Sequence, residues 1–270
     1  MAIRHPHQGR PDPLHSALEL RALLEAAVLP WTLPILMTAP RGDGHPVLLL
    51  PGFMGSEGSL IGLEVFLRNR DYAVETWGLG RNVGFHARHA NALEQKIRHM
   101  HHTSGRKVSL VGWSLGGVFA LYGAYQAPEC VRSVVTLGSP LTVDAGGSAS
   151  PPLIKAMYRL IAHPAGPEVH TMQPRARKLR ERKRLPLPLS CLYSVSDGIV
   201  PPQEATVDGD PALHENIRVP GSHVGLGFNA VVLWIVAERL SQPEGRWRPF
   251  APSGPLGYAY RMLTQDGVPS

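Results

Sequence analysis

One serine stands in a setting that could make it a nucleophile. Residues 112–116 read Gly-Trp-Ser-Leu-Gly, so Ser114 lies within a Gly-x-Ser-x-Gly motif. The apolar run 108–111 before it predicts a buried strand, and residues 118–125 after it predict a helix. In such a strand–turn–helix the serine occupies a strained turn at the top of a parallel sheet, and the glycines allow the strand and the helix to approach closely. The alternative is a glycine-rich turn that carries an inert serine.

A serine hydroxyl needs a neighbouring base, and that base needs an acidic partner to orient it. The order expected for this kind of turn is serine, then acid, then histidine along the chain. Asp197 follows the apolar run 189–195, and His223 lies between a short predicted strand and a long predicted helix. We therefore predict that His223 is the base and Asp197 its partner, although Asp197 could instead form a turn with Gly198. Other acids and histidines are available after Ser114: Asp144, Asp208, Asp210, His163, His170 and His214.

Backbone N–H groups are also expected to face the oxyanion of a tetrahedral intermediate. One is the N–H of Leu115, directly after the serine. The other is the N–H of Phe53, which follows Pro51-Gly52 at the end of the predicted strand 46–50. The alternative for this second loop is a simple glycine turn. Three apolar side chains near these loops and in the later insert are predicted to line a substrate pocket: Met54, Trp113 and Met157.

Strands and helices alternate along the part of the chain that carries these residues. Predicted strands cover residues 46–50, 72–77, 108–111, 131–137, 189–195 and 216–219, and a helix predicted over 57–70 has Ser56 as its cap. The alternation predicts an α/β fold with a doubly wound, mostly parallel sheet. Right-handed crossovers bring the loops after the strands to one edge of such a sheet. The candidate residues are therefore expected to meet there.

The remaining segments divide the chain into four parts. Residues 45–141 and 189–241 form the predicted core, and residues 142–188 interrupt it as a helical cap insert or as a surface excursion without a lid role. Residues 1–44 hold an amphipathic helix and an apolar strap. The strap either packs on the core, or borders the substrate entrance or touches a lipid surface. Residues 242–270 are rich in Pro and Gly and are predicted to wrap the surface.

Composition and charge exclude several classes of protein. The net charge of +6 comes largely from the run 175–184, without the aromatic pattern of a nucleic-acid module, so no nucleic-acid partner is expected. The histidines at 86, 89, 99, 101 and 102 lack convincing metal-ligand geometry, and no phosphate-binding or dinucleotide motif occurs, so no metal and no cofactor are expected. Cys130 and Cys191 are predicted to be buried thiols. The start of the chain lacks the pattern of a signal peptide, and the apolar run 26–39 is short and broken by prolines, so we expect a cytoplasmic protein.

Taken together, residues from about 46 to 240 resemble the α/β-hydrolase superfamily, and within it the bacterial lipase and esterase branch. The resemblance rests on residues 50–55 (Leu-Pro-Gly-Phe-Met-Gly), 112–117 (Gly-Trp-Ser-Leu-Gly-Gly), 196–201 (Ser-Asp-Gly-Ile-Val-Pro) and 221–225 (Gly-Ser-His-Val-Gly). It implies that Ser114 attacks an ester carbonyl, that His223 acts as general base and then general acid, and that Asp197 orients the histidine. Many members have His-Gly where this chain has Pro51-Gly52, so the support that a histidine gives the oxyanion loop is missing here.

The sequence thus predicts a serine hydrolase that cleaves carboxylic esters through an acyl-serine intermediate. The apolar side chains near the loops favour a small ester substrate with an apolar acyl group, and a weak contact with a membrane surface is a further possibility. An acyltransferase that uses the same three residues is the first alternative, and a non-catalytic binding protein of the same fold is the second. The sequence carries no indication of the oligomeric state.

Overall fold

Six parallel strands form the centre of the molecule. A computed structural model of the chain describes residues 18–84, 87–142, 185–252 and 254–264. In order along the chain, the strands are β1 (Pro46–Leu50), β2 (Ala73–Thr76), β3 (Val108–Trp113), β4 (Val131–Leu137), β5 (Leu189–Tyr193) and β6 (His214–Arg218). They lie in the order β2-β1-β3-β4-β5-β6, and every neighbouring pair is parallel. The predicted α/β fold with a doubly wound parallel sheet is confirmed.

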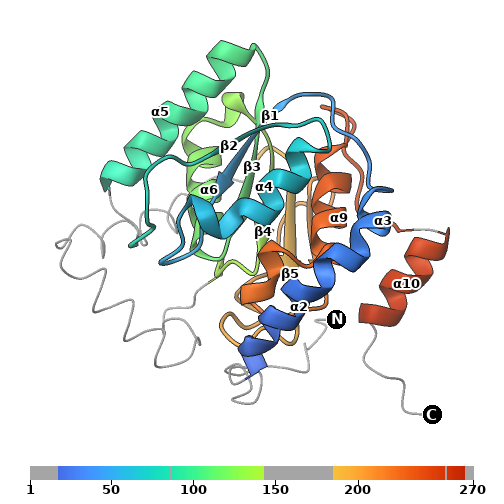
Figure 1. Cartoon of the computed structure of the whole chain (residues 1–270). Coiled ribbons are helices and arrows are strands. Elements are labelled where there is room, and N and C mark those ends of the chain that lie inside the picture. Colours follow the sequence, from blue (N-terminus) through green and yellow to red (C-terminus); the bar gives the residue numbers. More distant parts are fainter. Residues whose placement is uncertain (1–17, 85–86, 143–184, 253, 265–270) are drawn as a thin grey trace.

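Helices cover both faces of this sheet (Figure 1). On one face α5 (Ala87–Ser104) and α6 (Leu115–Gln126) pack against side chains such as Leu48 and Leu50 of β1. On the other face α4 (Ile61–Arg68) and α9 (Ala230–Leu240) pack against Val47 and Leu49 of the same strand. Successive residues of a strand point to opposite faces, so a strand buried on both sides has to be apolar throughout, as β1 is.

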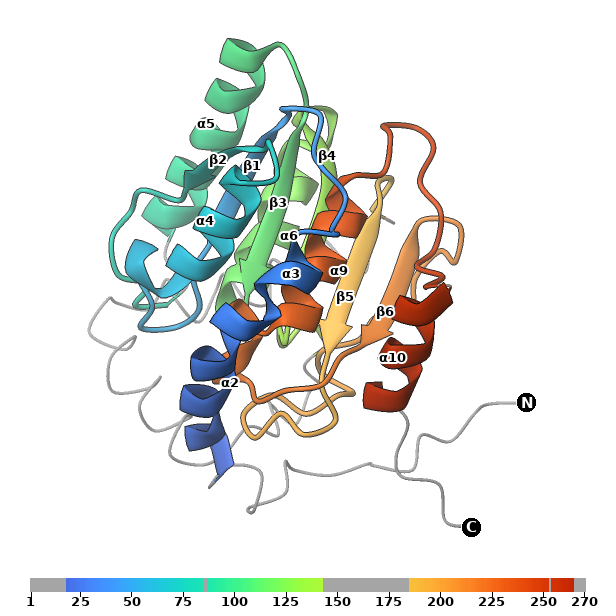
Figure 2. The same ribbon diagram turned by 45° about the vertical axis from the view of Figure 1, so that its right-hand side comes forward.

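Two segments outside this core pack beside it (Figure 2). The N-terminal part comprises η1 (Leu18–Arg21), α2 (Ala22–Val28), η2 (Leu29–Thr32) and α3 (Leu33–Leu36). Leu36 of α3 is buried in the apolar cluster around α9, while Trp31 is 84% exposed. At the other end α10 (Gly254–Thr264) lies beside β6, where the Tyr260 hydroxyl donates to the Arg218 carbonyl at 2.7 Å. The tail predicted as a Pro/Gly-rich strap therefore also contains a helix.

Several predicted boundaries were wrong in detail. The helix predicted over 57–70 begins as a single turn, η3 (Glu57–Leu60), before α4, and the Ser56 side chain makes no capping hydrogen bond. Instead, the Ser59 hydroxyl donates to the Ser56 carbonyl at 2.6 Å. The long helix predicted after His223 is divided into η6 (Val224–Gly227) and α9, and Asn229 caps α9 through its side chain. A further short turn, η4 (Pro128–Cys130), precedes β4. The predicted cap insert lies almost entirely within residues 143–184, outside the described residues.

Candidate active site

Ser114 occupies the turn between β3 and α6 in a conformation that few non-glycine residues adopt. Its φ is 53° and its ψ is −123°, and its N–H donates to the Leu137 carbonyl of the neighbouring strand at 2.8 Å. A non-glycine residue at positive φ costs on the order of 1–3 kcal/mol and persists only where the surrounding structure holds it. The bond to β4 and the packing of α6 hold Ser114 there, and the turn lifts its side chain above the sheet edge.

The two glycines of the motif are required for this turn. A Cβ on Gly112 would lie 2.4 Å from the Gly116 carbonyl oxygen, and a Cβ on Gly116 would lie 2.1 Å from the Leu50 carbonyl oxygen. Both contacts are with backbone atoms, which cannot move aside as the end of a side chain can. The crowding predicted from the sequence is confirmed.

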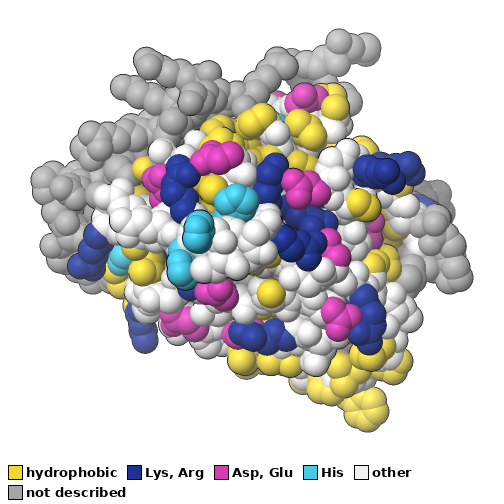
Figure 3. Space-filling view, turned by 90° about the horizontal axis from the view of Figure 1, so that it is seen from above, with side chains coloured by type: hydrophobic (Ala, Val, Ile, Leu, Met, Phe, Trp, Pro, Cys, Tyr) yellow, Lys and Arg dark blue, Asp and Glu magenta, His cyan; other side chains and the backbone are white. Residues whose placement is uncertain are grey.

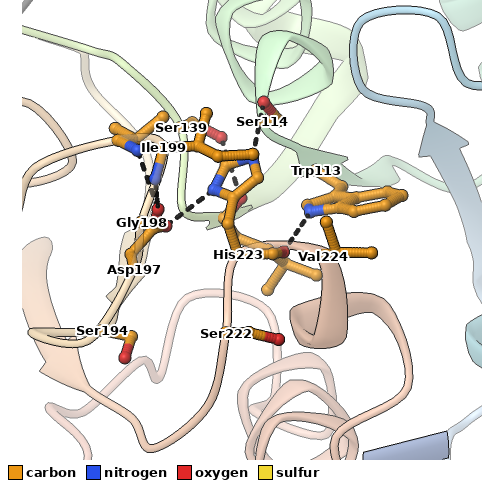
Figure 4. Close-up of polar contacts among 12 residues, drawn as sticks. Trp113, Ser114, Ser139, Ser194, Asp197, Gly198, Ile199, Ser222, His223 and Val224 are labelled. Carbon is orange, nitrogen blue, oxygen red and sulfur yellow. Dashed lines mark hydrogen bonds and ion pairs between the residues drawn. The ribbon is translucent and has the colours of Figure 1, made fainter. Parts of the chain in front are cut away.

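The structure brings Ser114, His223 and Asp197 together in one chain of hydrogen bonds (Figure 4). His223 Nδ1 lies 2.6 Å from Asp197 Oδ2, and His223 Nε2 lies 3.0 Å from Ser114 Oγ. The other oxygen of Asp197 accepts the N–H groups of Ile199 at 2.8 Å and Val200 at 2.7 Å. With its Nδ1 proton directed at the carboxylate, the imidazole presents Nε2 as the acceptor for the serine hydroxyl proton.

His223 is buried next to this carboxylate, and two effects on its pKa oppose each other. Burial disfavours the imidazolium and lowers the pKa, whereas the charge and hydrogen bond of Asp197, together with the charge of Glu19, raise it. The net effect is a pKa above the ordinary value of 6.5. A histidine with such a partner is a better proton acceptor than a free imidazole, as a general base needs to be.

The loop after β1 lies directly against Ser114. A Cβ on Gly52 would be 3.1 Å from the Cβ of Ser114, so only glycine allows this close approach. Asn82 is fully buried and holds the loop in place. Its side-chain Nδ2 donates to the Pro51 carbonyl at 2.8 Å, and its main-chain carbonyl accepts the Met54 N–H at 2.7 Å. Met54 itself has a positive φ of 64°. The Phe53 N–H is thus part of a fixed loop next to the serine.

Leu115, the other predicted oxyanion donor, is the first residue of α6. The first N–H groups of a helix have no acceptor within the helix, so the N–H of Leu115 is available for a partner outside it. Its place directly after Ser114 puts it at the positive end of the helix dipole.

The three predicted pocket residues lie in different surroundings or outside the described residues. Met54 belongs to the loop beside Ser114 and is partly exposed. The Trp113 indole lies beside His223 and donates to the His223 carbonyl at 3.1 Å, so that it supports the histidine loop (Figure 4). Met157 lies outside the described residues.

A second serine–histidine–aspartate arrangement occurs in the protein and is structural. His45 Nδ1 lies 2.6 Å from Asp43 Oδ1, and His45 Nε2 lies 2.9 Å from Ser109 Oγ. Ser109 follows Val108, the first residue of β3, whereas Ser114 comes directly after the last residue of that strand. Both His45 and Ser109 are fully buried, so no substrate can reach this serine. Burial also lowers the pKa of His45 to about 4 despite the Asp43 carboxylate.

Two of the competing residues, Asp210 and His214, have partners outside the site. Asp210 accepts the Ala212 N–H in a turn, and His214 Nε2 lies 3.1 Å from the Leu185 carbonyl. Asp144, His163 and His170 lie outside the described residues. Within the described part of the chain no group of three or more metal-ligating side chains is found. Figure 3 shows histidines interspersed with charges of both signs on one face of the molecule.

Sequence reasoning missed several residues that support the site. Besides Asn82, Gly138 lies against the histidine–aspartate pair, where a Cβ would be 3.0 Å from Asp197 Oδ2 and 3.1 Å from His223 Nδ1. Glu19 of η1 accepts the His223 N–H at 3.0 Å. The position of Gly138 at the end of β4 was a signal that could have been used. Glu19 gave no such signal, because its partners are backbone groups about 200 residues away.

Comparison with known proteins agrees with this geometry. Residues 45–160 match a family model described as alpha/beta hydrolase fold. A curated relative, a pimeloyl-[acyl-carrier protein] methyl ester esterase of Citrobacter koseri, is 34% identical over 103 residues, which are 38% of this chain and 39% of the relative. The match thus spans about two fifths of the length of that relative.

Solved structures with a similar fold include three lipases. Lipase B of Aspergillus fumigatus is 18% identical, with a TM-score of 0.57 over 76% of this chain and 54% of the lipase. The monoacylglycerol lipase of Paleococcus ferrophilus is 17% identical, with a TM-score of 0.51 over 74% of this chain and 96% of that protein. A soluble variant of the monoglyceride lipase of Saccharomyces cerevisiae is 17% identical, with a TM-score of 0.53 over 76% and 88%. At these identities the likeness establishes the fold.

The parallel sheet, the strained serine turn and the family match at residues 45–160 together lead to one conclusion. The chain has the α/β-hydrolase fold, and the proteins that it matches include esterases and lipases.

Proposed function

We propose that the protein is a serine hydrolase that cleaves carboxylic esters through an acyl-Ser114 intermediate. The single observation that carries the proposal is the hydrogen-bonded chain from Asp197 through His223 to Ser114, whose backbone is held at positive φ. The matches to esterases and lipases support the same class of reaction.

The geometry supports the following sequence of steps. Ser114 Oγ attacks the ester carbonyl carbon while its proton passes to His223 Nε2, and the charge on the resulting imidazolium is balanced by Asp197. The carbonyl oxygen becomes an oxyanion, which the N–H groups of Leu115 and Phe53 stabilise. The C–O bond to the alcohol then breaks, and His223 gives its proton to the departing alkoxide. Water, deprotonated by His223, then attacks the acyl carbon. The bond from that carbon to Ser114 Oγ breaks, His223 returns the proton to Oγ, and the carboxylic acid is released.

An apolar acyl group is the second part of the proposal. Phe53, in the loop after β1, and Trp113, directly before Ser114, are both packed against apolar clusters and both partly exposed. An acyl chain that contacted Phe53 and Trp113 would remove apolar surface from water, which favours binding.

A weak contact with a lipid surface is the third part. Helix α2, the turn η2 and the residue that follows α3 expose large apolar side chains at 61–84%: Leu23, Leu24, Trp31 and Met37. No described helix is long and apolar enough to cross a bilayer. A cytoplasmic location remains a prediction from the sequence. Cosedimentation with phosphatidylcholine vesicles tests the contact: wild type is expected in the pellet, and Trp31→Ala in the supernatant.

Hydrolysis of p-nitrophenyl esters of increasing acyl length tests the proposed reaction. Ser114→Ala is expected to lose activity, whereas Ser109→Ala is a matched control because Ser109 also contacts a histidine–aspartate pair but is inaccessible. Methyl esters belong in the series because the curated relative is named as a methyl ester esterase. Activity that Ser114→Ala retains would refute the assignment. Transfer of the acyl group to an added alcohol, with little hydrolysis, would indicate an acyltransferase.

A further inference from the structure

The N-terminal segment η1–α2 crosses the two loops that carry Asp197 and His223. It lies outside the sheet and its helices, yet η1 and α2 both contact η6, which begins directly after His223 (Figure 2). Three charged side chains of this segment bind the loops: Glu19, Arg21 and Glu25. Such bonds join parts of the chain that are 175 to 205 residues apart.

Glu19 binds both loops with one carboxylate. Its Oε1 accepts the N–H of Gly198 at 2.8 Å and that of His223 at 3.0 Å, and its Oε2 accepts the N–H of Val224 at 2.9 Å. Gly198 is the residue after Asp197. A single side chain thus fixes the backbone of the histidine relative to the backbone beside its acidic partner.

Arg21 and Glu25 hold the outer parts of the same loops. The Arg21 guanidinium donates to the Ser196 carbonyl at 2.7 Å and to the Ser196 hydroxyl at 2.8 Å. Glu25 Oε1 accepts the Ser222 N–H at 2.8 Å. Neither side chain binds the backbone of His223 itself, which distinguishes them from Glu19.

In the described part of the chain, the other hydrogen bonds of these loops do not involve the backbone N–H of His223, which donates to Glu19. Trp113 donates to the His223 carbonyl, and the Ser194 and Ser196 hydroxyls donate to the Gly221 carbonyl. His223 is 4% exposed, so loss of Glu19 would leave its N–H in a place that water reaches poorly. Displacement of the loop is the expected response.

Glu19 also changes the electrostatics of the site. Asp197, from the loop after β5, and Glu19, from η1, are the two carboxylates whose charge raises the pKa of His223 against the effect of burial. Arg21 and Glu25, the other charged groups of η1 and α2 at these loops, form an ion pair with an N–O distance of 3.7 Å. Removal of the Glu19 charge therefore lowers the pKa of His223.

The geometry assigns to Glu19 the role of a positioning residue, which holds His223 at hydrogen-bond distance from both Ser114 and Asp197. This assignment rests on the proposed function, since it concerns the same three residues. Positioning is worth a great deal in catalysis, because a displacement of about 1 Å can reduce the rate about 100-fold.

Three variants test this role: Glu19→Ala, Glu19→Gln and, as a matched control, Glu25→Gln. Glu19→Ala removes every acceptor and is expected to lower kcat/KM for a p-nitrophenyl ester about 10- to 100-fold. Glu19→Gln keeps one oxygen for the Gly198 and His223 N–H groups, so it is expected to recover most of the activity. In the pH profile of kcat/KM, the acidic limb of Glu19→Gln is expected to have its midpoint at a lower pH than the acidic limb of wild type. The acidic limb of Glu25→Gln is expected to have the same midpoint as that of wild type.

A role confined to folding predicts a different result. In that case Glu19→Ala lowers the midpoint of thermal unfolding but keeps kcat/KM and the pH limb of wild type, and the proposal is overturned. If Glu19→Ala does not fold, the test is made with Glu19→Gln. An acidic limb of kcat/KM that coincides with the limb of wild type would then contradict the positioning role of Glu19.

A measurement without substrate separates this inference from the proposed function. Titration of the ¹³C-labelled His223 ring by NMR is expected to give a lower pKa in Glu19→Gln than in wild type and no such decrease in Glu25→Gln. If wild type cleaves no ester and the decrease is still found, the proposed function fails and the coupling of Glu19 to His223 stands. If esters are cleaved and the decrease is absent, the coupling fails and the proposed function stands.

Discussion

Replacement of Asp197 by Asn tests the role of the carboxylate without a change in shape. In wild type, Oδ1 accepts the N–H groups of Ile199 and Val200, and Oδ2 faces His223 Nδ1. The two backbone donors require an oxygen opposite them, so the amide introduced by Asp197→Asn has to direct its NH₂ group at the histidine. Nδ1 must then accept a hydrogen bond, which moves the ring proton to Nε2, the atom that faces Ser114.

The wrong tautomer cannot take the serine proton. From the loss known for this substitution in a related arrangement, we expect kcat to fall about 10⁴-fold. This corresponds to about 5.5 kcal/mol of transition-state stabilisation, since each tenfold change in rate is about 1.36 kcal/mol. The fold should persist, because both backbone N–H groups keep their acceptor.

The assay is hydrolysis of a p-nitrophenyl ester under saturating conditions, with circular dichroism as the check on folding. Asp208→Asn and Asp210→Asn serve as controls, since both acids lie in the segment between β5 and β6, and activity near that of wild type is expected for each. If Asp197→Asn stays within about 10-fold of wild type while Asp144→Asn becomes inactive, the acid has been wrongly assigned.

Three further predictions follow from the same geometry. Asn82→Ala removes the side-chain bond to the Pro51 carbonyl, which loosens the loop that carries the Phe53 N–H, and it is expected to lower kcat about 100-fold. Asn216→Ala, which breaks a similar side-chain bridge to Val207, should retain the kcat of wild type, and equal kcat values for the two variants would contradict the role of the loop. Because His223 must be neutral to act as a base and its pKa is raised, the acidic limb of kcat/KM is expected to have its midpoint above pH 6.5; a midpoint below 6 in a pH–rate profile would argue against this. Burial keeps His45 neutral in the fold, with a pKa of about 4. The free energy of unfolding, measured with urea, is therefore expected to fall between pH 6.5 and pH 4, by at most about 3 kcal/mol from this group. The decrease should be smaller in His45→Gln, and an identical pH dependence in the two proteins would contradict this role of His45.

The sign of the last effect follows from the unfolded chain. Below pH 6.5 a histidine of the unfolded chain binds a proton, whereas the buried His45 stays neutral until the pH is much lower. Acid therefore stabilises the unfolded state relative to the folded state. His223 has a raised pKa and acts in the opposite direction, since its contribution is lost as the pH rises through that pKa. The comparison with His45→Gln isolates the first group.

The sheet and the three central residues could be predicted because the sequence encodes them locally. A run such as Pro46–Leu50 has one stable environment, a strand buried on both faces. The carboxyl ends of parallel strands share an edge, so residues after β3, β5 and β6 had to meet. Gly-x-Ser-x-Gly gave the turn because a Cβ at either glycine meets backbone.

The supporting residues could not be predicted because their partners are main-chain atoms far away in the sequence. Nothing near Asn82 indicates that it binds the carbonyl of Pro51, and nothing near Glu19 indicates the N–H of His223. Ser56 had the type of a capping residue, but the first turn after it is η3, which is bonded through Ser59 instead. Only the packed structure decides such competitions between polar groups.

The most direct test of the central claim is covalent labelling with an alkyl phosphonate ester, followed by mass spectrometry of the digested protein. One equivalent of label on Ser114 is expected in wild type and in Ser109→Ala, with labelling at least about 100-fold slower in His223→Ala, because the serine then lacks its base. Label on a different residue, or the same labelling rate with and without His223, would contradict the account.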